Sequence, residues 1–398
     1  MSLLRKSNFA AIMIVFTLLG MSLSAMPISK EYTELENIDA KFSSHTNISI
    51  EGYQEDSIYS YSTLSSGGYT QCIITEDNRV ACWGNNDQGK RGLGGGIGNA
   101  SVTPPGKAGP WLVGNLSVGM VEVSAGGWST CSLKETGEIW CWGGGEYGQL
   151  GSGTDVCQDV PGGVSCADAT NHPPVQISLP MGKTAISLSD ANQGHFCAIL
   201  NTGEGLCWGW NNHGQLGDGT VCTGGNYFSD NNNPTPNGCN SNNGRYTPVI
   251  VDDSNFPTNS SFISISTGFH HTCGIIDNND LYCWGYNDNG QIGIGDIDYM
   301  NYPIPQFVDS NVIAVSTGNN HVCALYESQT VKCWGANSEG QLGTGYMANE
   351  ATPTAINLSS NISLISIESA YNANCAISEA FIPICWGANQ FGQIGNYD

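Results

Sequence analysis

The cysteines are the side chains whose type and spacing most clearly predict chemistry. The chain has 16 of them, and twelve form six pairs in which the two cysteines lie ten residues apart. The other four form two local pairs, Cys157 with Cys166 and Cys222 with Cys239. An even number of locally paired cysteines is typical of disulfides in an exported protein. Zinc is the alternative, but this spacing does not resemble the short Cys-x-x-Cys spacing of zinc ligands.

The six ten-residue pairs belong to six copies of one segment. The first copy runs from Cys72 to Gly94 (CIITEDNRVACWGNNDQGKRGLG), and every copy has Cys, nine residues, Cys-Trp-Gly and a polar, glycine-rich loop. The predicted disulfides are Cys72–Cys82, Cys131–Cys141, Cys197–Cys207, Cys273–Cys283, Cys323–Cys333 and Cys375–Cys385. A recurrence of this kind determines the fold more strongly than any local secondary-structure preference.

Each pair of cysteines is predicted to join the two strands of a β-hairpin. Turn-forming residues lie midway between the cysteines, such as Asp77-Asn78 in the first copy and Thr136-Gly137 in the second. Directly opposed residues of an antiparallel pair have Cα atoms about 4.5–5.5 Å apart. A disulfide accepts Cα separations of about 4.4–6.8 Å, so the spacing fits a cross-strand disulfide.

Further strands are predicted on both sides of the hairpin. An apolar strand ending at a small residue precedes it, as in Ile263–Gly268, and strands that begin with proline follow it, at Pro174–Ile177, Pro248–Val251 and Pro353–Ile356. Four antiparallel strands per repeat, repeated radially, predict an all-β protein, a β-propeller of six four-stranded blades. The repeats begin near residues 58, 118, 184, 261, 311 and 362, and the tryptophan of each Cys-Trp-Gly is expected to pack between neighbouring blades.

Residues 1–25 resemble a secretory signal peptide. Arg5 and Lys6 precede an apolar run, Phe9–Leu19, which is shorter than the roughly 20 residues of a membrane span. Residues 26–44 are interpreted as a polar leader and residues 45–398 as the propeller. The formal net charge of −23 disfavours nucleic acid and anionic membranes as partners. We therefore expect a secreted, periplasmic or cell-surface monomer without a membrane span after cleavage.

The repeat resembles that of the regulator of chromosome condensation family. The shared pattern is Gly-x-x-His-x-Cys, a turn, Cys-Trp-Gly, Gly-Gln-Leu-Gly and then proline. The family histidine is matched at His195, His271 and His321 and replaced by Thr70, Ser129 and Ala373, so we expect it to form structural hydrogen bonds. Propellers of this family are typically seven-bladed, whereas six repeats are found here. Propellers often close by borrowing a strand from the other end of the chain.

The closing strand is predicted at Asn47-Ile48-Ser49-Ile50, an apolar run in a polar region. The last copy stops shortly after Gln393-Ile394-Gly395 and has no strand that begins with proline. We expect the N-terminal strand to pair in the blade that contains Cys375 and Cys385.

Aromatic side chains cluster in two kinds of connection that a four-stranded meander places on the same face. One is the turn between the first and second strands, and the other is the loop between the third and fourth, which also carries the insertions 152–172 and 218–246. The candidate binding face consists of Tyr69, Trp128, Tyr147, Trp210, Phe269, His270, Tyr286, Tyr371 and Phe391. Aromatic side chains beside stapled loops are suited to recognising a protein or a glycan, while scattered surface aromatics are the alternative.

The leading hypothesis is an exported binding scaffold that recognises an unidentified protein or a surface glycan. It is not predicted to be an enzyme, and it needs no cofactor and no metal. Asp277-Asn278-Asn279-Asp280 and Asp296-Ile297-Asp298 are interpreted as turn residues rather than calcium ligands. The alternatives are a secreted enzyme inhibitor, as the family resemblance allows, a glycan hydrolase with a carboxylate pair, and guanine nucleotide exchange on a GTPase, which export disfavours.

Overall fold

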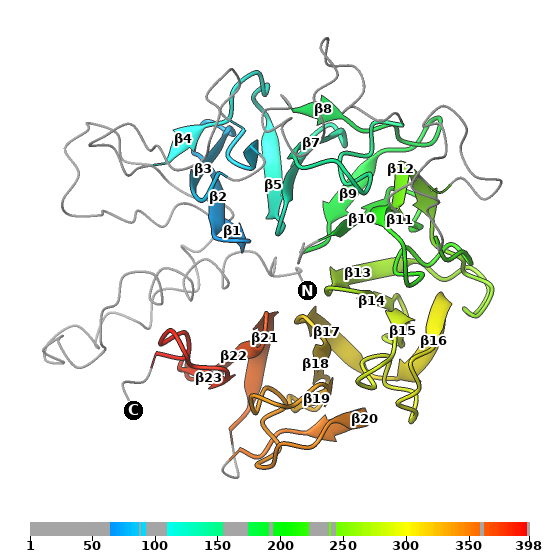
Figure 1. Cartoon of the computed structure of the whole chain (residues 1–398), viewed down its shortest axis with the longest axis vertical. Helices are drawn as coiled ribbons and strands as arrows, with labels where there is room; N and C mark the ends of the chain where they lie inside the picture. Colours follow the sequence, from blue (N-terminus) through cyan, green and yellow to red (C-terminus); the bar gives the residue numbers. More distant parts are fainter. Residues whose placement is uncertain are drawn as a thin grey trace, which may run out of the picture.

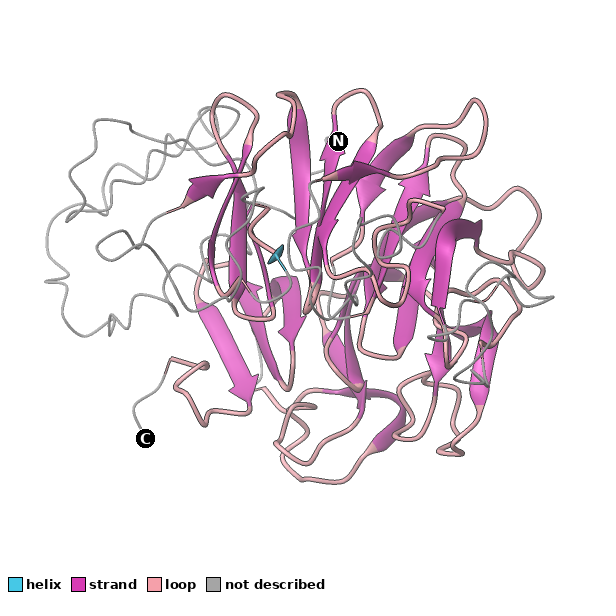
Figure 2. Cartoon of the chain, turned by 45° about the horizontal axis from the view of Figure 1, so that its top comes forward, coloured by secondary structure: helices cyan, strands magenta, loops and turns pink. Residues whose placement is uncertain are grey.

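The computed structural model describes residues 64–86, 89–92, 110–153, 174–190, 194–222, 239, 244–358 and 362–395. Within these ranges the protein is all-β and contains no α-helix. Its strands form six antiparallel sheets around a common axis, five with four strands and one with three (Figure 1). The strands run between the two faces of this ring, with loops at both faces (Figure 2). The predicted propeller of six blades is thereby confirmed.

The blades follow one another in chain order. Within each blade the strands are also in chain order, with the first strand nearest the axis and the last at the outer edge (Figure 1). Blade 1 consists of β1 (Leu64–Gly67), β2 (Thr70–Ile74), β3 (Val80–Gly84) and β4 (Trp111–Leu112); blade 2 of β5 (Met120–Ala125), β6 (Ser129–Lys134), β7 (Ile139–Gly143) and β8 (Val175–Gln176); and blade 3 of β9 (Ala185–Leu188), β10 (His195–Leu200), β11 (Gly205–Trp210) and β12 (Gly244–Ile250). Blade 4 consists of β13 (Phe262–Thr267), β14 (His271–Ile276), β15 (Leu281–Tyr286) and β16 (Asn301–Asp309); blade 5 of β17 (Val312–Thr317), β18 (His321–Tyr326), β19 (Val331–Gly335) and β20 (Glu350–Ala355); and blade 6 of β21 (Leu364–Ala370), β22 (Ala373–Ser378) and β23 (Pro383–Gly387).

A disulfide joins the second and third strands of every blade. In blade 1, Cys72 of β2 lies directly opposite Cys82 of β3, and the other five blades have the same register. The Cα–Cα distance is 4.1 Å in all six. Three residues form each hairpin loop, and the third has a positive φ, such as Asn78 at 56°. Cys222 and Cys239 are also bonded, whereas Cys157 and Cys166 lie outside the described residues.

The outer strands begin earlier than the prolines predict. Pro248 lies inside β12 and Pro353 inside β20, so of the three strands predicted to begin with proline only the short β8 directly follows its own, Pro174. An outer strand has a partner on one side alone, so it tolerates a residue that cannot donate a backbone hydrogen bond. Register shifts next to Cys207 and Cys333 let these strands continue past the proline.

The tryptophan after each second cysteine ties a blade to the one before it. Trp208 Nε1 donates to the Gln149 carbonyl oxygen of blade 2 at 2.9 Å, and Trp284 Nε1 to that of Gln215 in blade 3 at 3.0 Å. Trp334 and Trp386 make the same bond to Gln291 and Gln341. Trp142 bonds to the Lys90 carbonyl oxygen, so in the first repeat the loop motif ends at Gly92 rather than Gly94.

The contact between blades 6 and 1 differs from the other five. Apolar clusters of buried residues join each of the other adjacent pairs of blades. A sixth cluster, Leu64, Ile73 and Ala81 with Trp83 packed against it, contains residues of blade 1 alone. Among the described residues Trp83 lacks the bond that the other five tryptophans make. The predicted closing strand, Asn47–Ile50, lies outside the described residues, as do the signal segment 1–25 and the leader 26–44.

The described ranges contain no helix long and apolar enough to span a bilayer.

Candidate binding face

Seven aromatic side chains of blades 2, 3 and 4 form a continuous array, which we call the aromatic belt. Its members are Trp128, Tyr147, Trp210, His213, Phe269, His270 and Tyr286. At one end Tyr147 stacks on Trp210, with ring centroids 4.9 Å apart, and Trp128 lies 5.4 Å from Tyr147. The array continues from Trp210 to His270 at 4.7 Å, to His213 at 4.6 Å and to Tyr286 at 4.1 Å.

Two kinds of connection supply the belt, and both emerge on the same face of the ring. Trp128 lies in the turn between β5 and β6, while Phe269 and His270 lie in the equivalent turn between β13 and β14. Trp210 and Tyr286 end the third strands of blades 3 and 4, and Tyr147 and His213 occupy the loops that follow those strands in blades 2 and 3. The meander therefore brings together residues up to 158 positions apart in the sequence.

A glycine makes room for the largest rings. In blade 3 the turn position of Trp128 is occupied by Gly194, and a Cβ there would lie 2.8 Å from Trp210 Cε3 and 3.5 Å from Trp128 Cζ3. Any side chain at this position would displace Trp210, because contacts below about 3 Å are repulsive. Gly194 and His213 are the belt determinants that the sequence analysis omitted. His213 occupies the loop position of Tyr147, so aligning the repeats column by column would have identified it.

The belt histidines are uncharged at neutral pH. Burial, together with smaller contributions from the neighbouring His213 and His195, lowers the pKa of His270 to about 3. Burial also lowers the pKa of His213, although a bond from its Nδ1 to Asn301 Oδ1 (2.9 Å) opposes the shift. Trp210 Nε1 and His270 Nδ1 are buried without a hydrogen-bond partner among the described residues. The belt is thus an array of uncharged rings at neutral pH.

A hollow of about 150 Å³ lies at the blade 2 end of the belt, lined by Trp128, Glu146, Tyr147 and Gln149. In blades 3, 4 and 5 the side chain of an asparagine bridges the corresponding loop by hydrogen bonds to its backbone. Asn211 Oδ1, for example, accepts from Leu216 N at 3.1 Å, while its Nδ2 donates to the Thr220 carbonyl oxygen at 3.2 Å. Gly145 replaces this asparagine in blade 2, so the loop has no such side-chain bridge.

The two long insertions leave the fold beside Tyr147. Gly153, at the start of the first, donates its N–H to the Tyr246 carbonyl oxygen at 2.9 Å, at the end of the second. The Gly244 backbone packs directly on the Tyr147 carbonyl. The first insertion therefore begins where the second one ends, next to Tyr147 of the belt.

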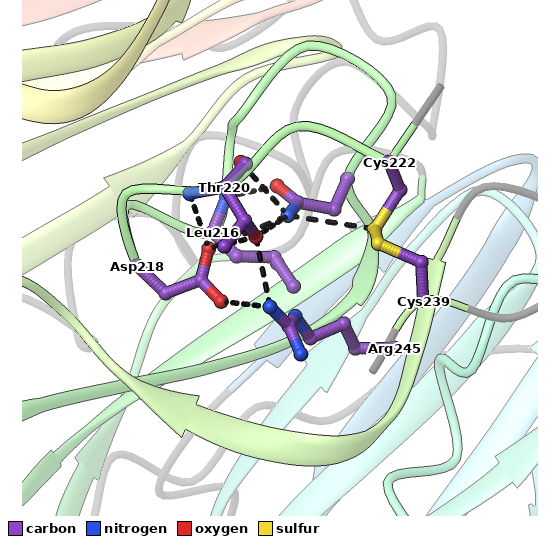
Figure 3. Close-up of polar contacts among 7 residues, drawn as sticks. Leu216, Asp218, Thr220, Cys222, Cys239 and Arg245 are labelled. Carbon is purple, nitrogen blue, oxygen red and sulfur yellow. Dashed lines mark hydrogen bonds and ion pairs between the residues drawn. A yellow bond between two sulfur atoms is a disulfide. The ribbon is translucent and has the colours of Figure 1, made fainter. Parts of the chain in front are cut away.

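A rigid base anchors the second insertion (Figure 3). The Cys222–Cys239 disulfide closes it, and Arg245 Nη2 lies 2.6 Å from Asp218 Oδ2 and 2.8 Å from Thr220 Oγ1. The Arg245 and Asp218 side chains are only 12% and 8% exposed, so solvent screens this ion pair weakly. The contacts fix where the insertion starts and ends.

Three predicted residues lie apart from the belt. Tyr69 of blade 1 and Tyr371 of blade 6 are close to one another, since Tyr69 contributes, after burial, to raising the pKa of Tyr371. Phe391 of blade 6 is 88% exposed and makes no ring contact with a described residue. The structure thus brings together Trp128, Tyr147, Trp210, Phe269, His270 and Tyr286, and adds His213.

The three family histidines form a buried row between blades. His195 Nε2 lies 2.8 Å from Thr272 Oγ1 of the next blade, and Thr272 donates its own hydrogen to the Gln215 carbonyl oxygen. His195 is therefore the donor. His321 Nε2 makes the equivalent bond to Asn374 Oδ1 at 2.8 Å. At the position of Thr272 the blade after His271 has Val322, and neither ring nitrogen of His271 makes a well-formed hydrogen bond with a described residue, although an interaction with the His321 backbone opposes the lowering of its pKa.

Within the described ranges, no group of three or more His, Cys, Asp or Glu side chains is arranged to hold a metal ion. The two acidic segments are built into turns. Asp280 accepts from Ser310 Oγ and Asn278 Nδ2, and Asp298 accepts from the Tyr302 hydroxyl and from Asn287 Nδ2.

Comparison with known proteins identifies the family. The family model described as RCC1-like domain matches residues 45–398, so the chain belongs to this family. The ultraviolet-B receptor UVR8 of Arabidopsis thaliana is 28% identical over 275 residues, which are 59% of this chain and 56% of the receptor. Human RCC1 domain-containing protein 1 is 29% identical over 179 residues, 39% of this chain and 46% of that protein. The chain thus spans about half the length of these relatives.

Solved structures show the same fold. Human WBSCR16 superposes with a TM-score of 0.66 and 18% identity, covering 83% of this chain and 78% of that one. Prp20p of Saccharomyces cerevisiae, which was studied with Gsp1p and histones, gives 0.61 and 20%, covering 79% and 67%. At these identities the likeness concerns the fold alone.

Proposed function

We propose that this RCC1-like propeller is an exported scaffold that binds a protein partner through the aromatic belt. The observation that carries the proposal is the uneven distribution of rings. Blades 2 to 4 present seven adjacent aromatic side chains, whereas the same turn of blade 5 carries Asn319 and Asn320. A role in holding blades together would place the rings in every blade, as it does for the buried tryptophans. Aromatic residues are enriched in the buried centre of protein interfaces.

Two further features support recognition by a preformed surface. The disulfides fit an oxidising compartment, and they hold the strands that support the belt. The start of the first insertion and the end of the second lie beside Tyr147, next to the belt. Because the belt rings already contact one another, little side-chain entropy is lost on binding.

The test is capture by the mature, oxidised protein. We expect it to retain a protein from extracellular and surface fractions, and Trp210→Ala to weaken the measured affinity at least tenfold. Phe391→Ala is the matched control, since it removes an exposed ring of blade 6 and should leave the affinity unchanged. Thermal unfolding of each variant checks that the fold is intact.

Two results would contradict the proposal. If Trp210→Ala and Phe391→Ala bind the captured protein as tightly as the parent, the belt is not the binding surface. If glycosidase treatment of the captured material abolishes retention, the ligand is a glycan.

A further inference from the structure

Three described asparagines begin an Asn-x-Ser sequence, the acceptor sequence for N-linked glycans on surface loops of exported proteins. The sequences are Asn115-Leu116-Ser117, Asn259-Ser260-Ser261 and Asn357-Leu358-Ser359. Each asparagine lies in the connection from the fourth strand of one blade to the first strand of the next, which is β4 to β5, β12 to β13 and β20 to β21. The three other such sequences begin at Asn47, Asn99 and Asn361, outside the described residues.

These connections lie on the face of the ring opposite the aromatic belt. Loops alternate between the two faces of a meander, so the connections share a face with the hairpin turns that join second and third strands (Figure 2). Gly119, in the first connection, donates its N–H to the Asn78 carbonyl oxygen of the blade 1 hairpin turn at 2.9 Å. Asp277, in the blade 4 hairpin turn, donates its N–H to the Ser261 carbonyl oxygen at 2.9 Å.

Asn115 and Asn259 present free amides to solvent. Both residues are exposed, and their side chains make no hydrogen bond with the described part of the chain. Their φ angles are +59° and +66°, a conformation that asparagine tolerates at the tip of a turn. Asn357 is exposed as well. A sugar attached to any of these amides therefore displaces no buried contact.

Asparagines of the loops on the belt face have a different role. Asn211, Asn287 and Asn337 are fully buried, and the side chain of each bridges its own loop by hydrogen bonds. None of the three begins an Asn-x-Ser or Asn-x-Thr sequence. The described acceptor sequences are therefore separated from the belt by the thickness of the ring.

We infer that Asn115, Asn259 and Asn357 carry N-linked glycans, which cover the face opposite the belt and leave the belt open to the protein partner. The inference rests on the export that the proposed function includes. The donor is an oligosaccharide linked through its anomeric carbon to the phosphate of a lipid carrier. Asparagine Nδ2 bonds to this carbon, the bond from the carbon to the phosphate oxygen breaks, and Nδ2 loses a proton as the lipid phosphate leaves.

Peptide mass spectrometry of the protein exported by its own cells tests the inference. We expect glycan masses on the peptides that contain Asn115, Asn259 and Asn357. Ser117→Ala should abolish the glycan at Asn115, and Ser117→Thr should retain it, because the acceptor sequence requires a hydroxyl two residues after the asparagine. Asn278 is the matched control, since it is exposed in the blade 4 hairpin turn on the same face and its peptide should carry no glycan.

A missing glycan at one of the three asparagines would overturn the assignment of that residue, and exported protein without any of them would overturn the inference. If the protein is unmodified while partner capture still depends on Trp210, the proposed function stands without glycans. If the glycans are present while capture ignores Trp210, the proposed function fails and the sites remain. Replacing all three asparagines with glutamine should leave the affinity for the captured protein unchanged, and a weaker affinity would show that the glycans belong to the interface.

Discussion

His271 shows how a single neighbouring residue decides whether a buried histidine is satisfied. His195 and His321 each donate to a polar side chain of the next blade, Thr272 and Asn374. For His271 the equivalent residue of the next blade is Val322, which offers no hydrogen-bonding side chain, and among the described residues neither ring nitrogen makes a well-formed hydrogen bond, an interaction with the His321 backbone aside. A buried polar group without a hydrogen bond costs about 1–3 kcal/mol.

Val322→Thr should therefore stabilise the protein. The new hydroxyl can accept from His271 Nε2 and donate to the Gln291 carbonyl oxygen, as Thr272 does between His195 and Gln215. Against the loss of one buried methyl group, we expect a net gain of about 1 kcal/mol in the free energy of unfolding. Denaturant unfolding measures it, and Val322→Ala is the control. Destabilisation of both variants to the same extent would contradict this account of His271.

The buried histidines also predict sensitivity to acid. Burial lowers the folded-state pKa of His195, His270 and His271 to about 3 and that of His321 to about 4. In the unfolded chain these groups titrate near 6.5, so the unfolded state binds more protons below that pH. The stability that depends on keeping these histidines neutral is thus fully present above about pH 6.5, and it is lost as the pH falls toward 4 for His321 and toward 3 for the other three.

Each such histidine removes about 1.4 kcal/mol per pH unit within this window. Unfolding in denaturant between pH 7.5 and pH 5 tests the prediction, because the carboxylates of the folded state titrate mostly below this range. A free energy of unfolding that does not change between these pH values would contradict it.

At the scale of the element, the joint between neighbouring blades depends on a tryptophan and a glycine. Gly217 has φ +75°, and a Cβ there would lie 2.6 Å from Trp284 Nε1. Gly395 ends the equivalent loop of blade 6 with φ +74°, and a Cβ there would meet nothing within 4 Å. The two positions share the same backbone conformation and differ in whether a neighbouring tryptophan is present.

Gly217→Ala and Gly395→Ala are therefore matched variants. Both add the strain of a left-handed alanine, about 1–2 kcal/mol. Only Gly217→Ala also forces Trp284 away from the Gln215 carbonyl, which should cost about 1–3 kcal/mol more. Calorimetric melting measures the difference, and the same loss of stability in both variants would show that Trp83 packs on Gly395 and that the joint between blades 6 and 1 is like the others.

The hairpin was the element that could be predicted most fully from sequence, because its disulfide spacing and turn residues are local. The opposed register of Cys72 and Cys82 agrees with the ten-residue interval and with the turn residues midway between the two cysteines. The start of an outer strand was predicted less well, since Pro248 and Pro353 lie inside their strands. An edge strand gains bonds from one neighbour only, so its ends depend on bulges in that neighbour that the repeat pattern does not contain.

For the whole molecule, the repeats predicted the propeller but only part of the binding face. The position of an aromatic residue in the motif predicts on which face of the propeller its ring lies. It does not predict whether the rings of neighbouring blades touch. Tyr69, Tyr371 and Phe391 share the motif positions of belt residues but lie in blades 1 and 6, where neighbouring blades offer no adjoining ring of the belt. The contact between Tyr147 and Gly244, at the base of the second insertion, could not be predicted from the repeat, because it joins loops of two different blades.

A photo-crosslinking residue placed at single positions tests most directly whether blades 2 to 4 hold the partner. Benzoylphenylalanine at Phe269 lies within the belt, and the same residue at Phe391 lies in the exposed loop of blade 6. The account predicts that irradiation of the complex links the partner to the Phe269 variant and leaves the Phe391 variant unlinked. Crosslinking through Phe391 with none through Phe269 would contradict it.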